Sequence, residues 1–410
     1  MKKYFAWKIL VLCLLASFPF QVEAQETISQ KEKKEATEKI IKKLTKKGYA
    51  FNVTFNDIEN RFLAYKDELD TISTVDSFVS FFNNIFDTYN LSHFWIWTPE
   101  QVSQRKNNSE IDIGAALVKT NQGYFVTRTT KNGVANKNGI LPGDIITAKN
   151  EISIQSSIQL KGRNLEEAII SLKRGDSTLE KKVKYFQHPP FSKDTIYYIN
   201  NQMAVITINS FRSGVYDRPL VESLFMNANQ AKRIIIDLRS NSGGYSGNVQ
   251  HLLSMVVPYK TICLYYVHRE DHDKFFRKFK RNPNSLIELA DFAGQSFVPL
   301  KLTKGMKVYQ GEVIVLIDER SGSGGDVFPA CIQDIQRGVI VGNKSAGRVL
   351  AGDSYELPKG MTLFYPTGES IRLDGTRLES KGCIPDVFMP REKIADTNYM
   401  MEFLKSYNMK

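Results

Sequence analysis

The chain is poor in residues that build covalent or metal-held frameworks. Its 410 residues include four cysteines, five histidines and three tryptophans. Beyond the first residues only Cys263, Cys331 and Cys383 remain, and an odd number at wide spacing argues against a disulfide framework or a zinc site. We therefore expect buried free thiols, with one bridge between two of them left open, and no metal ion or organic cofactor.

Long apolar segments are also scarce. The apolar run at residues 9–20 is too short to span a bilayer, and no later run is long enough. Lysines precede it and Val22-Glu23-Ala24 follows it, a pattern typical of a cleaved secretory signal. The sequence thus predicts a signal peptide over residues 1–24 and a secreted or periplasmic, bacterial mature protein. An uncleaved membrane anchor is the alternative.

Positive charge is in excess, but nothing ties it to nucleic acid. The formal net charge is +11, and much of it lies in residues 31–47, where lysines and glutamates surround apolar residues at helical spacing. Because no base-reading motif accompanies this stretch, a solvated helix face is favoured over a nucleic-acid site. Association of this basic region with an anionic surface stays open.

The pattern of apolar residues changes twice along the chain. Helical spacing predicts two or three helices before residue 99, and a polar loop over 101–110 follows. Strands punctuated by glycine begin at residue 111, with one helix expected over 164–173. Residues 271–284 are interpreted as a basic, weakly structured insertion.

From residue 195 apolar strands alternate with helices, which predicts an α/β sheet covered by helices. The expected strands are 202–208, 233–239, 312–318 and 338–342, and the expected helices are 247–255 and 326–335. A chain of this length exceeds what one hydrophobic core usually supports, so two or three domains are expected.

The residues most suggestive of chemistry are small ones at the ends of two strands. Ser323 lies in a Ser/Gly turn between an apolar strand and a helix, where free backbone N–H groups favour a developing negative charge. The loop with Gly243 and Gly244 follows another strand. An N–H from either glycine, together with that of Gly324, would form the two-donor oxyanion hole of acyl transfer. A plain Gly/Ser loop is the alternative.

Two longer motifs carry a resemblance to known families. Residues 139–146, Gly-Ile-Leu-Pro-Gly-Asp-Ile-Ile, resemble a PDZ signature. The chain resembles the C-terminal processing (tail-specific) peptidases in the order of its motifs. This segment is followed by Asp-Leu-Arg-x-Asn-x-Gly-Gly at 237–244, then by the serine turn, and then by Gly-x-x-Pro-Asp at 382–386. PDZ domains bind an extended peptide as an added strand, although a role as a rigid spacer stays open.

The resemblance implies a multidomain α/β chain. After the signal it places an N-terminal helical region at 25–107, a β-rich PDZ domain with helices at 108–190, and an α/β peptidase core of the ClpP/crotonase type at 195–410. The helical region would carry Ser92 and His93.

One position departs from the tail-specific pattern. The lysine of the Ser/Lys dyad falls on Arg348, and arginine stays protonated and cannot act as a base. Lys344 could substitute only if its loop were reshaped. The tricorn-like branch, which Gly-Ser-x-Gly-Asp-x-Phe at 322–328 also resembles, uses a Ser-His-Ser-Glu tetrad instead. Carried over, His93 is the base for Ser323.

The same resemblance implies supporting roles for further residues. Ser92 and Glu379 would orient the imidazole and stabilise its charged form. Asp326 would lie beside the oxyanion hole or shape substrate preference, and Arg348 is a further supporting candidate. Asp334 is interpreted as a structural carboxylate that pairs with Arg337 or Arg348.

The sequence therefore predicts a secreted serine peptidase that cleaves protein substrates through an acyl-enzyme on Ser323. Its partner would be a protein or peptide, held by its C-terminus in the PDZ domain, with no nucleic acid and no transmembrane segment. Two rivals stay open. One is a non-catalytic protein on the same fold, with Phe94, Trp95 and Trp97 lining an apolar ligand pocket; the other is a PDZ scaffold.

Overall fold

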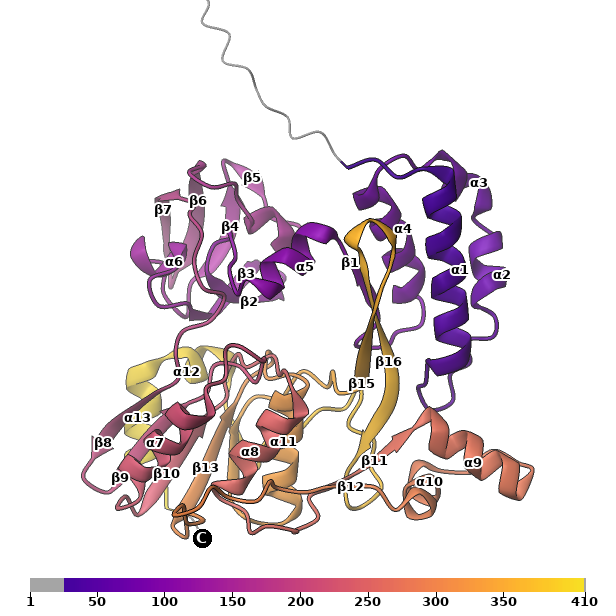
Figure 1. Ribbon diagram of the computed structural model, residues 1–410. Coiled ribbons are helices and arrows are strands. Elements are labelled where there is room, and N and C mark those ends of the chain that lie inside the picture. The colour runs from indigo at the N-terminus through magenta and orange to yellow at the C-terminus, as the bar shows by residue number, and fades with distance from the viewer. Residues whose placement is uncertain (1–25, 409–410) are drawn as a thin grey trace, which may run out of the picture.

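A computed structural model describes residues 26–408, so the predicted signal peptide over 1–24 lies outside the described residues. Figure 1 shows a sheet covered by helices, a small β unit above it and a group of N-terminal helices beside that unit. Between residues 26 and 408, no helix is both long and apolar enough to cross a membrane.

The central sheet has six strands in the order β17-β14-β13-β10-β9-β8, and only β8 runs antiparallel to its neighbour. Every residue of β10 (Arg233–Asp237) is buried, as expected for a parallel strand covered on both faces. The other strands are β8 (Thr195–Asn200), β9 (Met203–Thr207), β13 (Glu312–Ile317), β14 (Val339–Gly342) and β17 (Val387–Phe388).

Helices pack on both faces of this sheet because successive strand side chains point to opposite sides. Ile234 and Ile236 pack with one group of helices, whereas Ile235 packs with the C-terminal pair. The first group is α7 (Arg218–Ala228), α8 (Ser246–Ser254) and α11 (Gly324–Asp334), and the second is α12 (Arg391–Ala395) and α13 (Thr397–Ser406).

A second sheet connects the central sheet to the N-terminal helices. Its long strand β16 (Thr362–Ile371) pairs antiparallel with β1, β11 and β15, and Figure 1 shows the β15–β16 ribbon reaching toward α4. The remaining elements are β1 (Trp95–Trp97), β11 (Leu264–His268), α9 (Arg269–Phe279), α10 (Leu286–Ala293), β12 (Ser296–Phe297), β15 (Ala351–Glu356) and the 3-10 turn η2 (Pro358–Gly360).

The N-terminal helices are anchored by a buried aromatic cluster. Phe78, Phe82 and Phe86 of α4 pack in one core with Leu363 and Tyr365 of β16. The chain then passes through residues 92–93 into β1, which pairs with β16. Residues 92–93 therefore lie beside the C-terminal half of the chain. The helices are α1 (Gln30–Lys47), α2 (Ile58–Leu63), α3 (Lys66–Thr71), α4 (Val75–Asp87) and α5 (Pro99–Lys106).

The β unit between α5 and β8 is an antiparallel sheet in the order β2-β3-β4-β6-β7, so β2 lies at its edge. Contacts that join it to the central sheet and its loops include Thr127 Oγ1 to Ser240 Oγ (2.8 Å), Arg128 Nη2 to Asp237 Oδ2 (2.8 Å) and Arg320 Nη1 to the carbonyl oxygen of Leu117 (2.9 Å). Its elements are β2 (Ala115–Thr120), β3 (Gly123–Thr129), α6 (Val134–Lys137), β4 (Ile145–Lys149), β5 (Ile152–Ser153), η1 (Ser157–Leu160), β6 (Glu167–Arg174) and β7 (Ser177–Lys184).

Several expectations are confirmed. The four strands predicted after residue 195 are β9, β10, β13 and β14, and the two predicted helices are α8 and α11. Cys263, Cys331 and Cys383 are buried free thiols.

Three local predictions are wrong. Residues 164–173 are expected to be helical but lie largely in β6, where Ala168, Ile170 and Leu172 are buried at alternate positions. Pairing with β4 and β7 selects this period of two over the helical spacing. The loop expected over 101–110 is mostly helix α5, which begins with a capping box of Thr98 and Gln101. The insertion at 271–284 is mostly helix α9, and its Phe275 is buried.

The aromatic cluster gives a stability prediction. Phe82 is fully buried and contacts the rings of Phe62 and Phe78, so Phe82→Ala should lower the free energy of unfolding by about 3–5 kcal/mol. Leu63, which is 58% exposed on the neighbouring helix, is the control, and Leu63→Ala should change it by less than about 0.5 kcal/mol. Urea denaturation measures both. Equal effects of the two variants would contradict this packing.

Candidate active site

Ser323 lies at the turn between β13 and α11, where it is the residue before the first helical turn. Its backbone has φ 53° and ψ −113°, in the left-handed region that is costly for a residue other than glycine. Its N–H donates to the carbonyl oxygen of Arg348 (2.8 Å), and its side chain makes no capping hydrogen bond. The strained turn therefore presents the hydroxyl at the helix N-terminus, half-buried and facing a cleft.

The loop after β10 lies directly against this turn. A Cβ on Gly243 would stand 2.6 Å from Cβ of Ser323, and one on Gly244 would stand 2.1 Å from the carbonyl carbon of Phe211. Both glycines also have positive φ, 90° and 149°. Only glycine therefore allows the two loops to approach this closely.

The two glycines expected as oxyanion donors differ in their hydrogen bonding. The N–H of Gly243 already donates to Oδ1 of Asn241 (2.9 Å), which favours Gly244 over Gly243 as the expected donor. Within residues 26–408 the N–H groups of Gly244 and Gly324 form no hydrogen bond. These two donors stand on the two loops that meet at Ser323.

Ser92, His93 and Glu379 form a continuous hydrogen-bonded chain. Oγ of Ser92 lies 2.8 Å from Nδ1 of His93 and 2.8 Å from Oε2 of Glu379, and the N–H of Ser92 donates to Oε1 of Glu379 (2.8 Å). The buried carboxylate also accepts the N–H groups of Val349 (2.8 Å) and Leu350 (3.2 Å). Residues 287 positions apart in sequence are thus held in one network.

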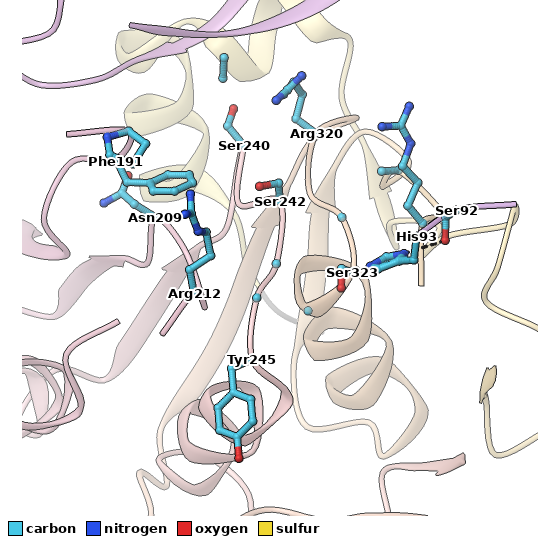
Figure 2. Close-up of a pocket in the computed structure, with 18 of the residues that line it drawn as sticks. Ser92, His93, Phe191, Asn209, Arg212, Ser240, Ser242, Tyr245, Arg320 and Ser323 are labelled. Carbon is cyan, nitrogen blue, oxygen red and sulfur yellow. Dashed lines mark hydrogen bonds between the residues drawn. The ribbon is translucent and has the colours of Figure 1, made fainter. Parts of the chain in front are cut away.

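This chain of contacts determines the tautomer of His93. A carboxylate only accepts hydrogen bonds, so the single hydroxyl proton of Ser92 points to Glu379. The same oxygen must then accept from Nδ1 of His93, which therefore carries the ring proton. Nε2 is left with a free lone pair, and Figure 2 shows the ring of His93 directed toward Ser323. Both side chains line the same cleft.

The surroundings keep this imidazole neutral. Burial lowers the pKa of His93 to about 4; the carboxylate of Glu379 opposes this shift, and the positive charge of Arg348 adds to it. The ring packs against Trp95 and Phe364, with ring centres 5.9 and 5.5 Å away. At neutral pH the side chain is therefore able to accept a proton.

Asp326 holds the loop that leads to Arg348, and Arg348 lines the cleft. Asp326 is buried and accepts hydrogen bonds from the hydroxyl of Ser345 and from the N–H groups of Gly347 (2.9 Å) and Arg348 (3.2 Å). Burial raises the pKa of this carboxyl to about 6. By holding the 345–348 loop, Asp326 fixes the Arg348 carbonyl that accepts the N–H of Ser323.

Two sequence-based assignments change in the structure. Asp334 forms its ion pair with Arg372, which approaches from β16, and not with Arg337 or Arg348. Phe94 points into the aromatic core of the N-terminal helices, whereas Trp95 and Trp97 line the cleft. Lys344 is exposed and is not among the residues that line the cleft.

The cleft that contains these groups has a volume of about 1260 Å³ and lies between the β unit and the central sheet. Among the lining residues that the sequence analysis did not identify are Arg105, Arg212 and Arg320. Only folding brings α5, the loop after β9 and the serine turn together, so no local motif could have identified them. Asn241 belongs to the 237–244 motif, but only the structure shows that its Oδ1 accepts the N–H of Gly243 and so orients that peptide group.

The effect of Arg348 on His93 can be measured directly. Arg348→Gln removes a charge that disfavours the imidazolium, so the pKa of His93 should rise above about 4 but stay below its ordinary value, because burial, the largest cause of the shift, remains. Arg348→Lys keeps the charge and should leave the pKa low. Titration of the His93 Cε1–H signal by NMR distinguishes the variants; an identical pKa in both would contradict the coupling.

Comparisons of sequence show what this arrangement is similar to. Residues 202–389 match the model of peptidase family S41. The Staphylococcus aureus (strain COL) protein "Probable CtpA-like serine protease" is 27% identical over 295 residues, 70% of this chain and 54% of that protein. Its Staphylococcus epidermidis counterpart is 26% identical over 307 residues, 73% of this chain and 57% of that protein. The chain spans little more than half the length of these relatives.

Comparisons of structure show the same fold. The photosystem II D1 C-terminal processing protease aligns with a TM-score of 0.63 at 12% identity, over 92% of this chain and 98% of that chain. Mature CPAF aligns with 0.57 at 13% identity, over 92% and 97%. Tricorn protease aligns with 0.51 at 16% identity, over 91% and 36%. The resemblance drawn from the motifs is confirmed, because residues 202–389 match the model of peptidase family S41 and the relatives include CtpA-like serine proteases.

Proposed function

We propose that this protein is a serine peptidase that cleaves peptide bonds of protein substrates through an acyl-enzyme on Ser323. The observation that carries the proposal is the chain from Glu379 through Ser92 to Nδ1 of His93, which leaves Nε2 unprotonated in the cleft that holds Ser323. A purely ligand-binding cleft has no need of such a chain. The arrangement corresponds to the base and its orienting groups in nucleophilic catalysis.

The reaction would proceed in two halves. Nε2 of His93 takes the hydroxyl proton of Ser323 as its oxygen attacks the substrate carbonyl carbon, and the carbonyl oxygen becomes an oxyanion. The C–N bond then breaks while the imidazolium returns the proton to the leaving amine. Water, deprotonated by the same nitrogen, hydrolyses the resulting ester and releases Ser323.

Three groups would lower the barrier around these steps. The N–H groups of Gly244 and Gly324 would donate to the oxyanion, aided by the positive end of α11. Glu379 stabilises the imidazolium through Ser92 without taking the proton. Because the ring is otherwise neutral, this charge appears only when the reaction requires it.

The β unit would hold the substrate. We propose that residues 108–190 form a PDZ domain, whose edge strand β2 lines the cleft and offers its free backbone side to an extended peptide. In the described structure Arg320 donates to the carbonyl oxygen of Leu117 in this strand (2.9 Å). A bound peptide strand would compete with that contact, next to the turn that carries Ser323.

Location and substrate form follow from the same proposal. The predicted signal peptide points to a secreted or periplasmic enzyme, and the motif resemblance points to cleavage near the C-terminus of the substrate. An extended peptide added to β2 would lead directly into the cleft.

Labelling with a fluorophosphonate probe tests the nucleophile and its base. The wild type should be labelled at Ser323, Ser323→Ala should not react, and His93→Gln should react at least about a hundredfold more slowly because the general base is lost. Intact-protein mass spectrometry measures the adduct. Ser242 lines the same cleft, and within residues 26–408 its side chain makes no hydrogen bond to the tetrad, so Ser242→Ala is the matched control and should keep wild-type labelling.

Arg320 gives a separate prediction for substrate capture. In the Ser323→Ala background, Arg320→Ala should tighten binding of an extended peptide about three- to tenfold. The reason is that the guanidinium no longer competes with the peptide for the Leu117 carbonyl oxygen. Fluorescence anisotropy of a labelled peptide measures the affinity. Lys119→Ala, in the same strand, is the control; unchanged affinity in Arg320→Ala would contradict strand addition at β2.

A further inference from the structure

Two arginines lie next to each other in the cleft. Arg105 is in the last turn of α5, Arg212 is in the loop after β9, and both line the cleft. Nη2 of Arg212 donates to the backbone oxygen of Arg105 (3.3 Å). The guanidinium carbon of Arg105 lies 4.3 Å from the centre of the Trp97 ring, and that of Arg212 lies 5.4 Å from the centre of the Phe191 ring. Aromatic faces thus support both groups and leave N–H edges free.

The charge of this pair is poorly compensated. Within residues 26–408 neither guanidinium forms an ion pair, and that of Arg105 donates no hydrogen bond. Burial, and then the charge of Arg212, lower the pKa of Arg105 to about 10, and burial lowers that of Arg212. The acid that acts on both is Glu110, whose own pKa is raised by burial and by the nearby Asp112. The pair is therefore suited to an anion from outside the chain.

The pair lies close to the reacting centre. Phe211, next to Arg212, donates its N–H to the carbonyl oxygen of Gly243 (3.0 Å) and accepts from the N–H of Tyr245 (2.8 Å). The oxyanion loop and the Arg212 backbone are thus one hydrogen-bonded unit. Figure 2 shows Arg212 and His93 on opposite sides of Ser323. An anion bound by the pair would belong to a segment of substrate a few residues from the scissile bond.

We propose that Arg105 and Arg212 form a receptor for a carboxylate of the peptide substrate. This rests on the proposed peptidase function and adds a substrate class to it, peptides with an acidic group at a set distance from the cleaved bond. Guanidinium edges match carboxylate oxygens and bind them by charge-assisted hydrogen bonds. The carboxylate belongs to an aspartate or glutamate side chain or to the substrate C-terminus, and the chemistry is the same for both.

Binding to a protein that cannot turn over separates this proposal from catalysis. In the Ser323→Ala background, peptides of one sequence are compared with a glutamate or a glutamine at successive positions, and with a free or an amidated C-terminus. At one place in the sequence, the peptide with a carboxylate should bind at least about tenfold tighter than the peptide with the matching neutral group, as expected for a charge-assisted contact. The position identifies a side-chain or a terminal carboxylate. The preference should weaken as salt rises.

Variants then assign the preference to the pair. Arg212→Gln and Arg105→Gln should each abolish most of the tenfold preference while leaving the affinity for the neutral peptide unchanged, and Arg212→Lys should keep part of it. Arg277→Gln, which removes an exposed arginine on α9, is the control for net charge. Equal melting temperatures check that the variants fold.

The outcomes separate the two proposals. Wild-type turnover of these peptides without any acidic preference, or a preference that survives in both glutamine variants, would overturn the carboxylate receptor alone. Binding with the expected preference but no turnover and no probe labelling would overturn the peptidase proposal and leave the receptor in place. Turnover together with a preference lost in the glutamine variants supports both.

Discussion

The buried carboxylate of Glu379 is the constraint on which the arrangement of the site depends. An ionised carboxylate withdrawn from water is stable only when its oxygens accept hydrogen bonds. The backbone of Ser92 and the N–H groups of Val349 and Leu350 supply these bonds, together with the Ser92 hydroxyl. The same contacts fasten the N-terminal helical region to the C-terminal half of the chain. The Ser92 hydroxyl that donates to Glu379 also contacts Nδ1 of His93, so the contacts that stabilise the carboxylate orient the imidazole as well.

Two residues of the cleft, His93 and Ser323, have strained backbone conformations. His93 and Ser323 have φ of 58° and 53°, values that surrounding packing must enforce. The Arg348 carbonyl holds the serine N–H, and Asp326 holds the loop that carries this carbonyl. Gly243 permits the close approach that completes the turn. The geometry of the turn is maintained by hydrogen bonds to backbone groups, which leaves the hydroxyl of Ser323 and the N–H groups of Gly244 and Gly324 without a hydrogen-bond partner among residues 26–408.

The charges around His93 differ from those around Arg105 and Arg212. Around His93, burial and Arg348 keep the imidazole neutral, while Glu379 favours its charged form. Around Arg105 and Arg212, Glu110 acts on both charges, but neither guanidinium forms an ion pair among residues 26–408. The first arrangement suits proton transfer, and the second suits recognition of a negative group. Both lie in one cleft beneath the β unit, so a peptide bound there would meet both.

The sequence by itself determined the elements whose signals are local. Buried parallel strands appear as apolar runs, and the Ser323 turn appears as small residues between a strand and a helix, so both could be predicted. Resemblance supplied Ser92, His93 and Glu379 as candidates. Only the tertiary structure decided that these three form one network and that Gly244, not Gly243, has a free N–H. It also made residues 167–174 a strand and gathered Arg105 and Arg212 from separate segments. Such contacts join residues far apart in the chain, and their energies depend on packing and hydrogen bonding that no local pattern encodes.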